Sequence, residues 1–273
     1  MVAGSNPARL INADTSLPPL LLEFLASRRQ GSSPRTLQFY KICLVPFLTK
    51  YDLTPVGINQ FLSSLNCHNG KDSYYRAIRV LSNWAYRQGY IKENPINKVD
   101  RPKITRIILP SLTPEQVEYL IDQAENVRDK AIISLFADSG IRLNELVRIR
   151  AEDIDWQKCT ITVFGKGKHR MAPFKGRTAV LLKEVISQNG GGSNIWHLTS
   201  WGVVSILRRL KQKTGLPCHP HTFRRTFASN LHRCGLDVEH IMRLGGWESL
   251  DMVLRYTRSV KFEDSLRLYR QTV

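Results

Sequence analysis

Cysteine is scarce in this sequence, and the few cysteines are far apart. The five lie at Cys43, Cys67, Cys159, Cys218 and Cys234, and none belongs to a C-x-x-C pair. Secreted domains that depend on disulfides usually carry an even number of cysteines in a regular framework. We therefore expect reduced, mostly buried thiols in this protein.

Long apolar runs are missing as well. No stretch approaches the ~18 consecutive apolar residues of a membrane-spanning helix. The first residues, Met1 to Leu10, lack the charged region and the apolar block of a secretory signal. These absences predict a protein that stays in the cytoplasm and does not span a membrane.

Motifs for nucleotides and metals are also absent. The Gly-rich turn at residues 165–168 does not fit the P-loop pattern G-x-x-x-x-G-K-[ST] and has no β-α-β unit around it, which disfavours nucleotide hydrolysis. A zinc finger needs ligands at a defined spacing. The possible ligands here lack that spacing; they are Cys218, His219, His221, His232 and Cys234. We expect no metal and no cofactor.

Positive charge is abundant. The chain has 40 Lys and Arg against 23 Asp and Glu, which gives a formal net charge of +17. Such an excess favours a polyanionic partner, with nucleic acid as the leading candidate. Charge alone leaves two alternatives open, an anionic membrane surface and a soluble protein that is merely basic.

Length and hydrophobic pattern predict two domains. A chain of 273 residues with 42% apolar residues exceeds the usual size of one domain. Residues 1–16 lack periodicity and are expected to form a tail. Residues 17–95 follow a helical period and predict a small helical bundle. Residues 96–111 are basic and flanked by prolines, as in an interdomain linker, which places the boundary near residue 105.

The second domain, residues 112–273, is expected to be helical around a small β element. Thr113 and Pro114 are typical of a helix start. Between Asp153 and Phe174 the hydrophobic period changes to two, which indicates an antiparallel hairpin. Helical patterns resume after a Gly-rich loop at residues 190–193 and continue almost to the end. The predicted fold class is mainly α with a small antiparallel hairpin or sheet.

Several basic residues are candidates for contacts with phosphates. In the first domain they lie on the polar sides of the expected helices, where a solvated charged face is an equal alternative for each one. In the second domain they lie in or next to the motifs described below. The candidates are Arg28, Arg35, Arg76, Arg79, Lys168, Arg170 and Arg225.

Four short motifs in the second domain are weak singly but specific in their order. They are the box at residues 140–146 (GIRLNEL), the turn at 165–168 (GKGK), the pair at 221–224 (HTFR), and the segment at 244–247 (LGGW) followed by Tyr256. In this combination the chain resembles the tyrosine recombinase or phage integrase family. The resemblance covers residues 112–267 by motif and the helical first domain by general organisation only.

The resemblance implies a set of catalytic residues, which are Arg142, Lys166, His221, Arg224, Trp247 and Tyr256. Tyr256 would be the nucleophile and Lys166 the general acid, while the others would hold the phosphate. Phosphoryl transfer needs fixed cationic donors, and a guanidinium offers two hydrogen bonds and a permanent charge. Arg225 departs from the pattern, because many members carry a second His at that position.

Each of these residues also has a simpler interpretation. Arg142 could form an i,i+3 salt bridge with Glu145 on an exposed helix. His221 could be an ordinary helix-start residue, Trp247 a structural tryptophan, and a Tyr is most often a packing residue. Lys168 or Arg170 could hold a phosphate in place of Lys166.

By resemblance, the protein would cut and rejoin duplex DNA at a specific recombination site. A 3′-phosphotyrosine and a Holliday junction would form without metal or ATP, inside a clamp made by both domains, in the cytoplasm and close to the nucleoid. The C-terminal segment, residues 261–273, would link protomers into a tetramer or pack on its own domain. Two alternatives are a type IB topoisomerase and a DNA-binding protein on the same fold without catalysis.

Overall fold

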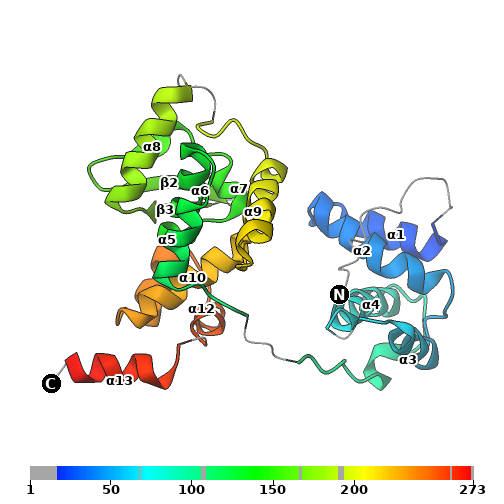
Figure 1. Ribbon diagram of the computed structural model, residues 1–273. Helices are drawn as coiled ribbons and strands as arrows, with labels where there is room; N and C mark the ends of the chain where they lie inside the picture. The colour runs from blue at the N-terminus through cyan, green and yellow to red at the C-terminus, as the bar shows by residue number, and fades with distance from the viewer. Residues whose placement is uncertain are drawn as a thin grey trace. The chain divides into compact units, whose positions relative to one another are not determined.

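The computed structural model describes residues 17–67, 69–105, 109–165, 168–189, 194–258 and 260–271. Within these ranges the chain is mainly helical and has one three-stranded antiparallel sheet (Figure 1). The predicted fold class is therefore confirmed. The chain divides into two compact units between residues 106 and 107.

The first unit is a bundle of short helices. Three of the α-helices begin with a proline in the first turn, and a hydroxyl side chain caps two of these, since Ser33 accepts from the N–H of Thr36 and Thr54 from that of Gly57. The elements are α1 (Pro19–Arg28), α2 (Pro34–Leu48), α3 (Pro55–Ser64), α4 (Lys71–Arg87) and the 3-10 helix η2 (Pro95–Lys98).

Aromatic and aliphatic side chains fill the core of this bundle. Phe24 is fully buried and meets Trp84 edge to face, with ring centroids 5.5 Å apart. Ile96 and Val99 also belong to this core. The predicted linker starts at residue 96, but packing on the first unit continues to Val99 because the side chain of Asn94 caps η2 and turns the chain inward.

The second unit contains the sheet and the remaining helices of the described residues. Its elements are α5 (Pro114–Asp122), α6 (Val127–Ser139), α7 (Leu143–Leu146), the 3-10 helix η3 (Ala151–Asp153), β1 (Ile154–Asp155), β2 (Thr160–Gly165), β3 (Lys168–Pro173), α8 (Gly176–Asn189), α9 (Ser200–Thr214), α10 (Pro220–Arg233), α11 (Val238–Gly245), α12 (Leu250–Thr257) and α13 (Phe262–Gln271).

The predicted period-two segment is the hairpin of β2 and β3, to which β1 adds a third strand. The strands are antiparallel in the order β1-β2-β3, with Ile161 opposite Ala172 and Val163 opposite Arg170. Ile161 and Val163 point into the core, and Thr162 between them is exposed, as the alternation predicted. The Gly-rich loop expected at residues 190–193 lies outside the described residues.

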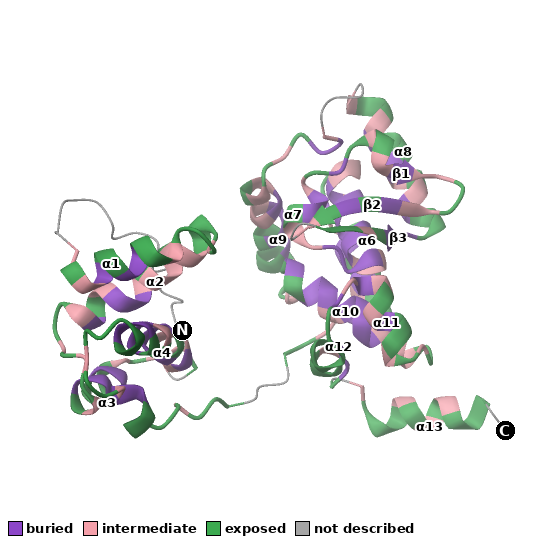
Figure 2. Cartoon of the chain, turned by 180° about the vertical axis from the view of Figure 1, so that it is seen from behind, coloured by how far each residue is buried: buried purple, intermediate pink, exposed green. Residues whose placement is uncertain are grey.

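Two apolar clusters organise the second unit. The larger one lies between α6, α10 and β2, where Figure 2 shows buried residues gathered, and includes the stacked pair Phe136 and Phe223. The smaller cluster joins α10, α11 and α12. Its members are Phe227, Ala228, Ile241, Trp247 and Val253, with Tyr256 packed against them. This small cluster sets the position of α12, and therefore of Tyr256, relative to α10.

The last helix, α13, has no buried residue. The side chain of Arg267 donates to the carbonyl of Arg233 at 2.9 Å, while Phe262 and Tyr269 are 75% and 66% exposed. No helix in the described ranges is long and apolar enough to cross a membrane. The same ranges contain no group of three or more Cys, His, Asp or Glu side chains placed to hold a metal.

Candidate active site

Three arginines meet at the C-terminal end of α11. The backbone carbonyls of residues 244–246 accept hydrogen bonds, in chain order, from Arg170, Arg224 and Arg142, at 3.3, 2.7 and 3.0 Å. The last carbonyls of a helix lack partners within the helix and carry partial negative charge, so they attract cationic donors. Side chains from β3, from α10 and from the start of α7 are thereby gathered at one point.

Two glycines make this approach possible. Gly246 caps α11 in the left-handed conformation with φ +61°, and a Cβ there would lie 2.3 Å from Cδ of Arg170. Gly140 ends α6 with φ +55°, and its Cβ would lie 2.7 Å from the ring of Phe227. The carbonyl of Gly140 accepts a second hydrogen bond from Arg224. Both positions require glycine because close packing and the backbone conformation exclude a side chain.

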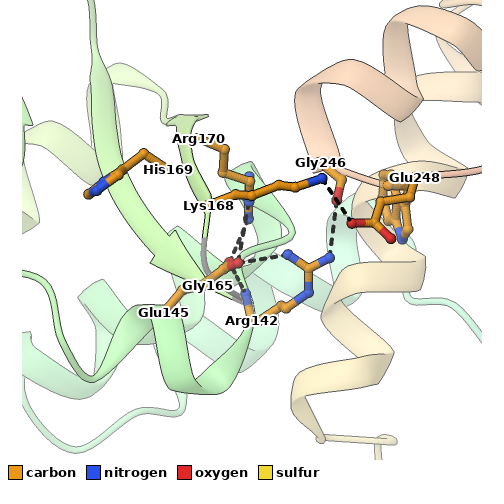
Figure 3. Close-up of a pocket in the computed structure, with 9 residues that line it drawn as sticks. Arg142, Glu145, Gly165, Lys168, His169, Arg170, Gly246 and Glu248 are labelled. Carbon is orange, nitrogen blue, oxygen red and sulfur yellow. Dashed lines mark hydrogen bonds and ion pairs between the residues drawn. The ribbon is translucent and has the colours of Figure 1, made fainter. Parts of the chain in front are cut away.

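A buried carboxylate joins two of the arginines. Oε1 of Glu145 accepts from Nη1 of Arg142 and Oε2 from Nη2 of Arg170, both at 2.7 Å, and Oε2 also accepts from the backbone N–H of Arg142 (Figure 3). Burial by itself would raise the pKa of Glu145, but hydrogen bonds and charge from Arg170 and Arg142 lower it overall. The simpler interpretation of Arg142 as a partner of Glu145 therefore describes a real contact.

The salt bridge with Glu145 leaves Arg142 accessible to a ligand and does not neutralise the positive charge of the site. One carboxylate stands against three guanidinium groups, which leaves an excess of positive charge. The side chain of Arg142 is 30% exposed and can still reach a ligand. Burial, followed by the charges of Arg142 and Arg170, lowers the pKa of Arg224 to about 9. A bound anion would relieve this repulsion, so the electrostatics of the site favour a phosphate.

Arg224, Trp247 and Tyr256 contact one another in a row. The guanidinium carbon of Arg224 lies 4.1 Å from the centroid of the Trp247 ring, and the Trp247 and Tyr256 rings are 5.5 Å apart. The tryptophan and the tyrosine are therefore in direct contact. Tyr256 is half-buried, and its backbone carbonyl accepts from the hydroxyl of Ser229 at 2.7 Å, which fixes α12 to α10.

The indole N–H of Trp247 is buried and has no hydrogen-bond partner among the described residues. A buried donor without a partner is costly, commonly by about 1–3 kcal/mol. Such a cost is compensated when a ligand supplies the acceptor. The orphaned donor is consistent with a phosphate oxygen as its partner.

His221 lies at the start of α10, one turn before Arg224. Pro220 occupies the first helical position, and Nδ1 of His219 accepts from the backbone N–H of His221 at 3.3 Å. Burial, followed by the charges of Arg225, Arg224 and Arg142, lowers the pKa of His221, so its imidazole is neutral at pH 7. The His221 side chain thus lies within the field of Arg224 and Arg142. Lys166 lies outside the described residues.

A pocket of about 190 Å³ lies beside this arrangement, between the hairpin and the turn after α11. Lys168 of β3 forms an exposed ion pair with Glu248 across it at 3.7 Å (Figure 3). Neither His221 nor Tyr256 lines it. The lining residues are Arg142, Glu145, Gly165, Lys168, His169, Arg170, Gly246, Trp247 and Glu248.

The remaining candidates for phosphate contacts fall into different environments. Arg35, Arg76 and Arg79 are exposed on the first unit, whereas Arg28 is half-buried, with its guanidinium 5.3 Å from the centroid of the Phe24 ring. In the second unit, Arg170 is partly buried and pairs with Glu145.

Arg225 is half-buried and donates to the backbone carbonyl of Pro110 at 3.1 Å. The contact of Glu145 with Arg170 was not predicted from the sequence. The structure shows that it requires Gly165 on β2, because a Cβ there would lie 2.7 Å from Oε1 of Glu145.

Comparison with known sequences gives one family. The model of the phage integrase family matches residues 110–262. The chain is 30% identical to the tyrosine recombinase XerC of Oceanobacillus iheyensis over 87% of its own length and 89% of the relative's length. It is 29% identical to the tyrosine recombinase XerA of Pyrococcus furiosus, covering 84% of this chain and 85% of that protein.

Solved structures with the same fold include integrases in complex with DNA. A lambda integrase dimer bound to a COC′ core site has a TM-score of 0.74 at 17% identity, covering 89% of this chain and 96% of that one. A lambda integrase tetramer bound to a Holliday junction has a TM-score of 0.75 at 16% identity, covering 89% and 78%. At these identities the likeness shows a shared fold.

Proposed function

This chain belongs to the phage integrase family, and from that premise we propose that Tyr256 is the nucleophile with which it breaks and rejoins DNA strands. The protein is a tyrosine recombinase, an enzyme that acts site-specifically on DNA. A type IB topoisomerase activity is not favoured, because the relatives that match along most of the chain are recombinases.

The proposed reaction is a transesterification at one phosphodiester. Oη of Tyr256 attacks the phosphorus, the Oη–P bond forms, and the bond from phosphorus to the 5′ oxygen breaks. The phenol loses its proton and the departing 5′ oxygen gains one, which leaves a 3′-phosphotyrosine and a free 5′-hydroxyl. The covalent intermediate conserves the phosphodiester energy, so a 5′-hydroxyl from a second duplex can reverse the step without ATP. Two such exchanges pass through a Holliday junction.

Arg142 and Arg224 are proposed to hold the non-bridging oxygens of this phosphate. Their guanidinium groups come from different elements and are fixed by the adjacent carbonyls of Gly246 and Gly245. Preorganised donors of this kind stabilise the charge that develops in the transition state, because they need no reorientation. The indole N–H of Trp247 would supply one more donor.

Proton transfer falls to two other residues in this proposal. His221, neutral at pH 7 because of its lowered pKa, can accept the phenolic proton or a hydrogen bond. Lys166 is assigned as the general acid for the 5′ oxygen by its motif position between β2 and β3.

Partner and assembly follow the family. We infer that the substrate is duplex DNA with a specific recombination site, encountered in the cytoplasm at the nucleoid. Arg35, Arg76 and Arg79 of the first unit are exposed and available for phosphate contacts. A tetramer on DNA is proposed to form through α13, whose Phe262 and Tyr269 are largely exposed and suited to an apolar contact with a neighbouring protomer.

One observation carries the assignment of the site. Arg224, which sits on the carbonyl of Gly245 at the end of α11, is stacked on Trp247, and Trp247 contacts Tyr256. The guanidinium of Arg224 thus contacts the indole of Trp247, which contacts the phenol ring of Tyr256. The indole N–H has no partner among the described residues. Such a row suits an attack on an anionic phosphate.

The decisive experiment is to trap the covalent complex. The purified protein first selects a binding site from a library of random-sequence duplexes. The selected site is then nicked so that the strand released after cleavage diffuses away, and the adduct is digested and identified by mass spectrometry. We expect the nucleotide on the peptide that contains Tyr256, and an adduct on another residue would overturn the proposal.

A further inference from the structure

We propose that Arg170 is a positioning residue for the cleavage reaction, which holds Glu145 so that this carboxylate fixes the guanidinium of Arg142. The inference rests on the proposed function, because it concerns how one of the two phosphate-binding arginines is oriented. Its sequence-based interpretation was a direct phosphate contact. A direct phosphate contact predicts that loss of Arg170 weakens DNA binding, whereas the positioning role predicts a nearly unchanged affinity for DNA.

The environment of Arg170 is that of an interior group. Its side chain is 14% exposed, and its donors are directed at Glu145 and at the carbonyl of Leu244. Contacts to a DNA backbone are usually made by exposed basic side chains with free donors. A guanidinium that is largely shielded from solvent and already bound to protein acceptors on α7 and α11 serves the protein framework.

Both arginines bind both oxygens of Glu145. Oε1 accepts from Nη1 of Arg142 at 2.7 Å and from Nε of Arg170 at 3.5 Å, whereas Oε2 accepts from Nη2 of Arg170 and from the backbone N–H of Arg142. Without Arg170, Oε2 would keep only the backbone donor in a site where the side chain of Glu145 is 2% exposed. The carboxylate would then rotate or take up a proton, and the orientation of Arg142 would be lost with it.

The backbone leaves room for this pair on both sides. A Cβ at Gly165 would lie 2.7 Å from Oε1 of Glu145, and one at Gly246 would lie 2.3 Å from Cδ of Arg170. Gly246 is also the residue whose carbonyl binds Arg142. The same turn therefore accommodates Arg170 and anchors the arginine that Arg170 is proposed to orient. Because the hairpin and α11 are tied together here, misplacing Arg170 would disturb Arg142 without removing any group that touches DNA.

The test compares Arg170→Met, Glu145→Gln and the double variant on the nicked duplex that the wild-type protein selects. For each protein we would measure the single-turnover rate of adduct formation and the Kd for the same duplex. We expect Arg170→Met to slow adduct formation on the order of 10²-fold, the cost of a misplacement of about 1 Å. The Kd should change by less than about threefold. The double variant should be no slower than the slower single variant, because both changes act on one contact.

A duplex with a neutral methylphosphonate at the scissile position distinguishes the positioning role from a purely structural one. A purely structural defect would slow cleavage of this substrate as much as cleavage of the phosphate. The methyl group removes the charge that Arg142 is proposed to stabilise, so wild type and Arg170→Met should differ much less on this substrate than on phosphate.

Arg177→Met serves as the matched control, since Arg177 forms a surface ion pair with Glu118 in the same unit. We expect its adduct formation to match the wild type. If Arg170→Met does not fold, Arg170→Lys is measured instead, with a smaller loss expected because one ammonium replaces a two-pronged donor.

Distinct outcomes separate this inference from the proposed function. A wild-type protein that forms no adduct on Tyr256 overturns both. Normal adduct formation by Arg170→Met overturns the inference alone. A weakened Kd with a salt dependence reduced by about one phosphate contact would identify Arg170 as a DNA ligand and would likewise overturn it.

Discussion

The guanidinium of Arg224 lies over the indole ring of Trp247, with its central carbon 4.1 Å from the ring centroid. The ring of Tyr256 is another neighbour of the indole, with centroids 5.5 Å apart. Trp247 therefore contacts both a buried cation and the proposed nucleophile. Its buried N–H has no hydrogen-bond partner among the described residues.

Tyr256→Phe should abolish the covalent adduct while leaving DNA binding unchanged. Only the phenolic oxygen is removed, whereas the ring that packs on Trp247 is kept. The measurement is adduct formation on the selected nicked duplex, together with the Kd for that duplex. A Tyr256→Phe protein that still forms the adduct would show that another residue is the nucleophile.

Trp247→Phe and Trp247→Ala separate the two contributions of this residue. Phe keeps the stacked ring and loses the N–H, so we expect cleavage to fall about tenfold or more, as for a hydrogen bond to a charged group worth about 1.5–3 kcal/mol. The melting temperature should change little. Ala should also lower the free energy of unfolding by about 3–5 kcal/mol, because it empties the small cluster between α10, α11 and α12. Unchanged cleavage by Trp247→Phe would assign Trp247 a packing role only.

Arg224→Lys should slow cleavage on the order of 10²- to 10³-fold, the cost of losing a preorganised transition-state donor. It should also destabilise the fold, because one ammonium cannot serve the carbonyls of both Gly140 and Gly245, and an unsatisfied buried acceptor costs about 1–3 kcal/mol. Thermal unfolding and adduct formation would be measured together. The exposed Arg148→Lys is the control and should leave both unchanged. Wild-type cleavage by Arg224→Lys would contradict the proposed role.

The pH dependence of cleavage should reflect the lowered pKa of His221. The proposed role needs the neutral imidazole, so the rate should fall as the pH drops through the pKa of His221, below its ordinary value of about 6.5. The pKa itself can be measured by NMR, with His221→Gln to assign the resonance. Arg225→Met should raise the pKa of His221, because the charge of Arg225 is, after burial, the main cause that lowers this pKa. A pKa of His221 above the ordinary value would refute this account.

Lys166→Met should slow cleavage of an ordinary phosphodiester far more than cleavage of a substrate with sulfur in place of the 5′ bridging oxygen. A thiolate leaves without protonation, so a missing general acid matters less for the sulfur substrate. Adduct formation on both duplexes gives the ratio. An equal loss on both would assign Lys166 to phosphate binding, and Lys168→Met then tests the neighbouring lysine.

Most of the helices and the hairpin were predictable because their signals are local. Thr54 and Thr113 cap the helices that follow them, and Gly140 ends α6 in the left-handed conformation, all within a few residues of chain. The alternation from Thr160 to Val163 is likewise a property of one strand. The extension of the first core to Val99 was not predictable from local pattern, since it depends on contacts with distant helices.

The sequence by itself determined the order of the motifs, the helical periods, the glycines and the excess of positive charge. These sufficed to predict the fold class, and the family resemblance of the motifs nominated the catalytic set of Arg142, Lys166, His221, Arg224, Trp247 and Tyr256. Only the tertiary structure decided that three arginines share the successive carbonyls at the end of α11, and that Glu145 joins two of them. The physical reason is distance along the chain. Arg170 and Leu244 are 74 residues apart, and their contact depends on how the hairpin packs against a helix whose end has carbonyls to satisfy.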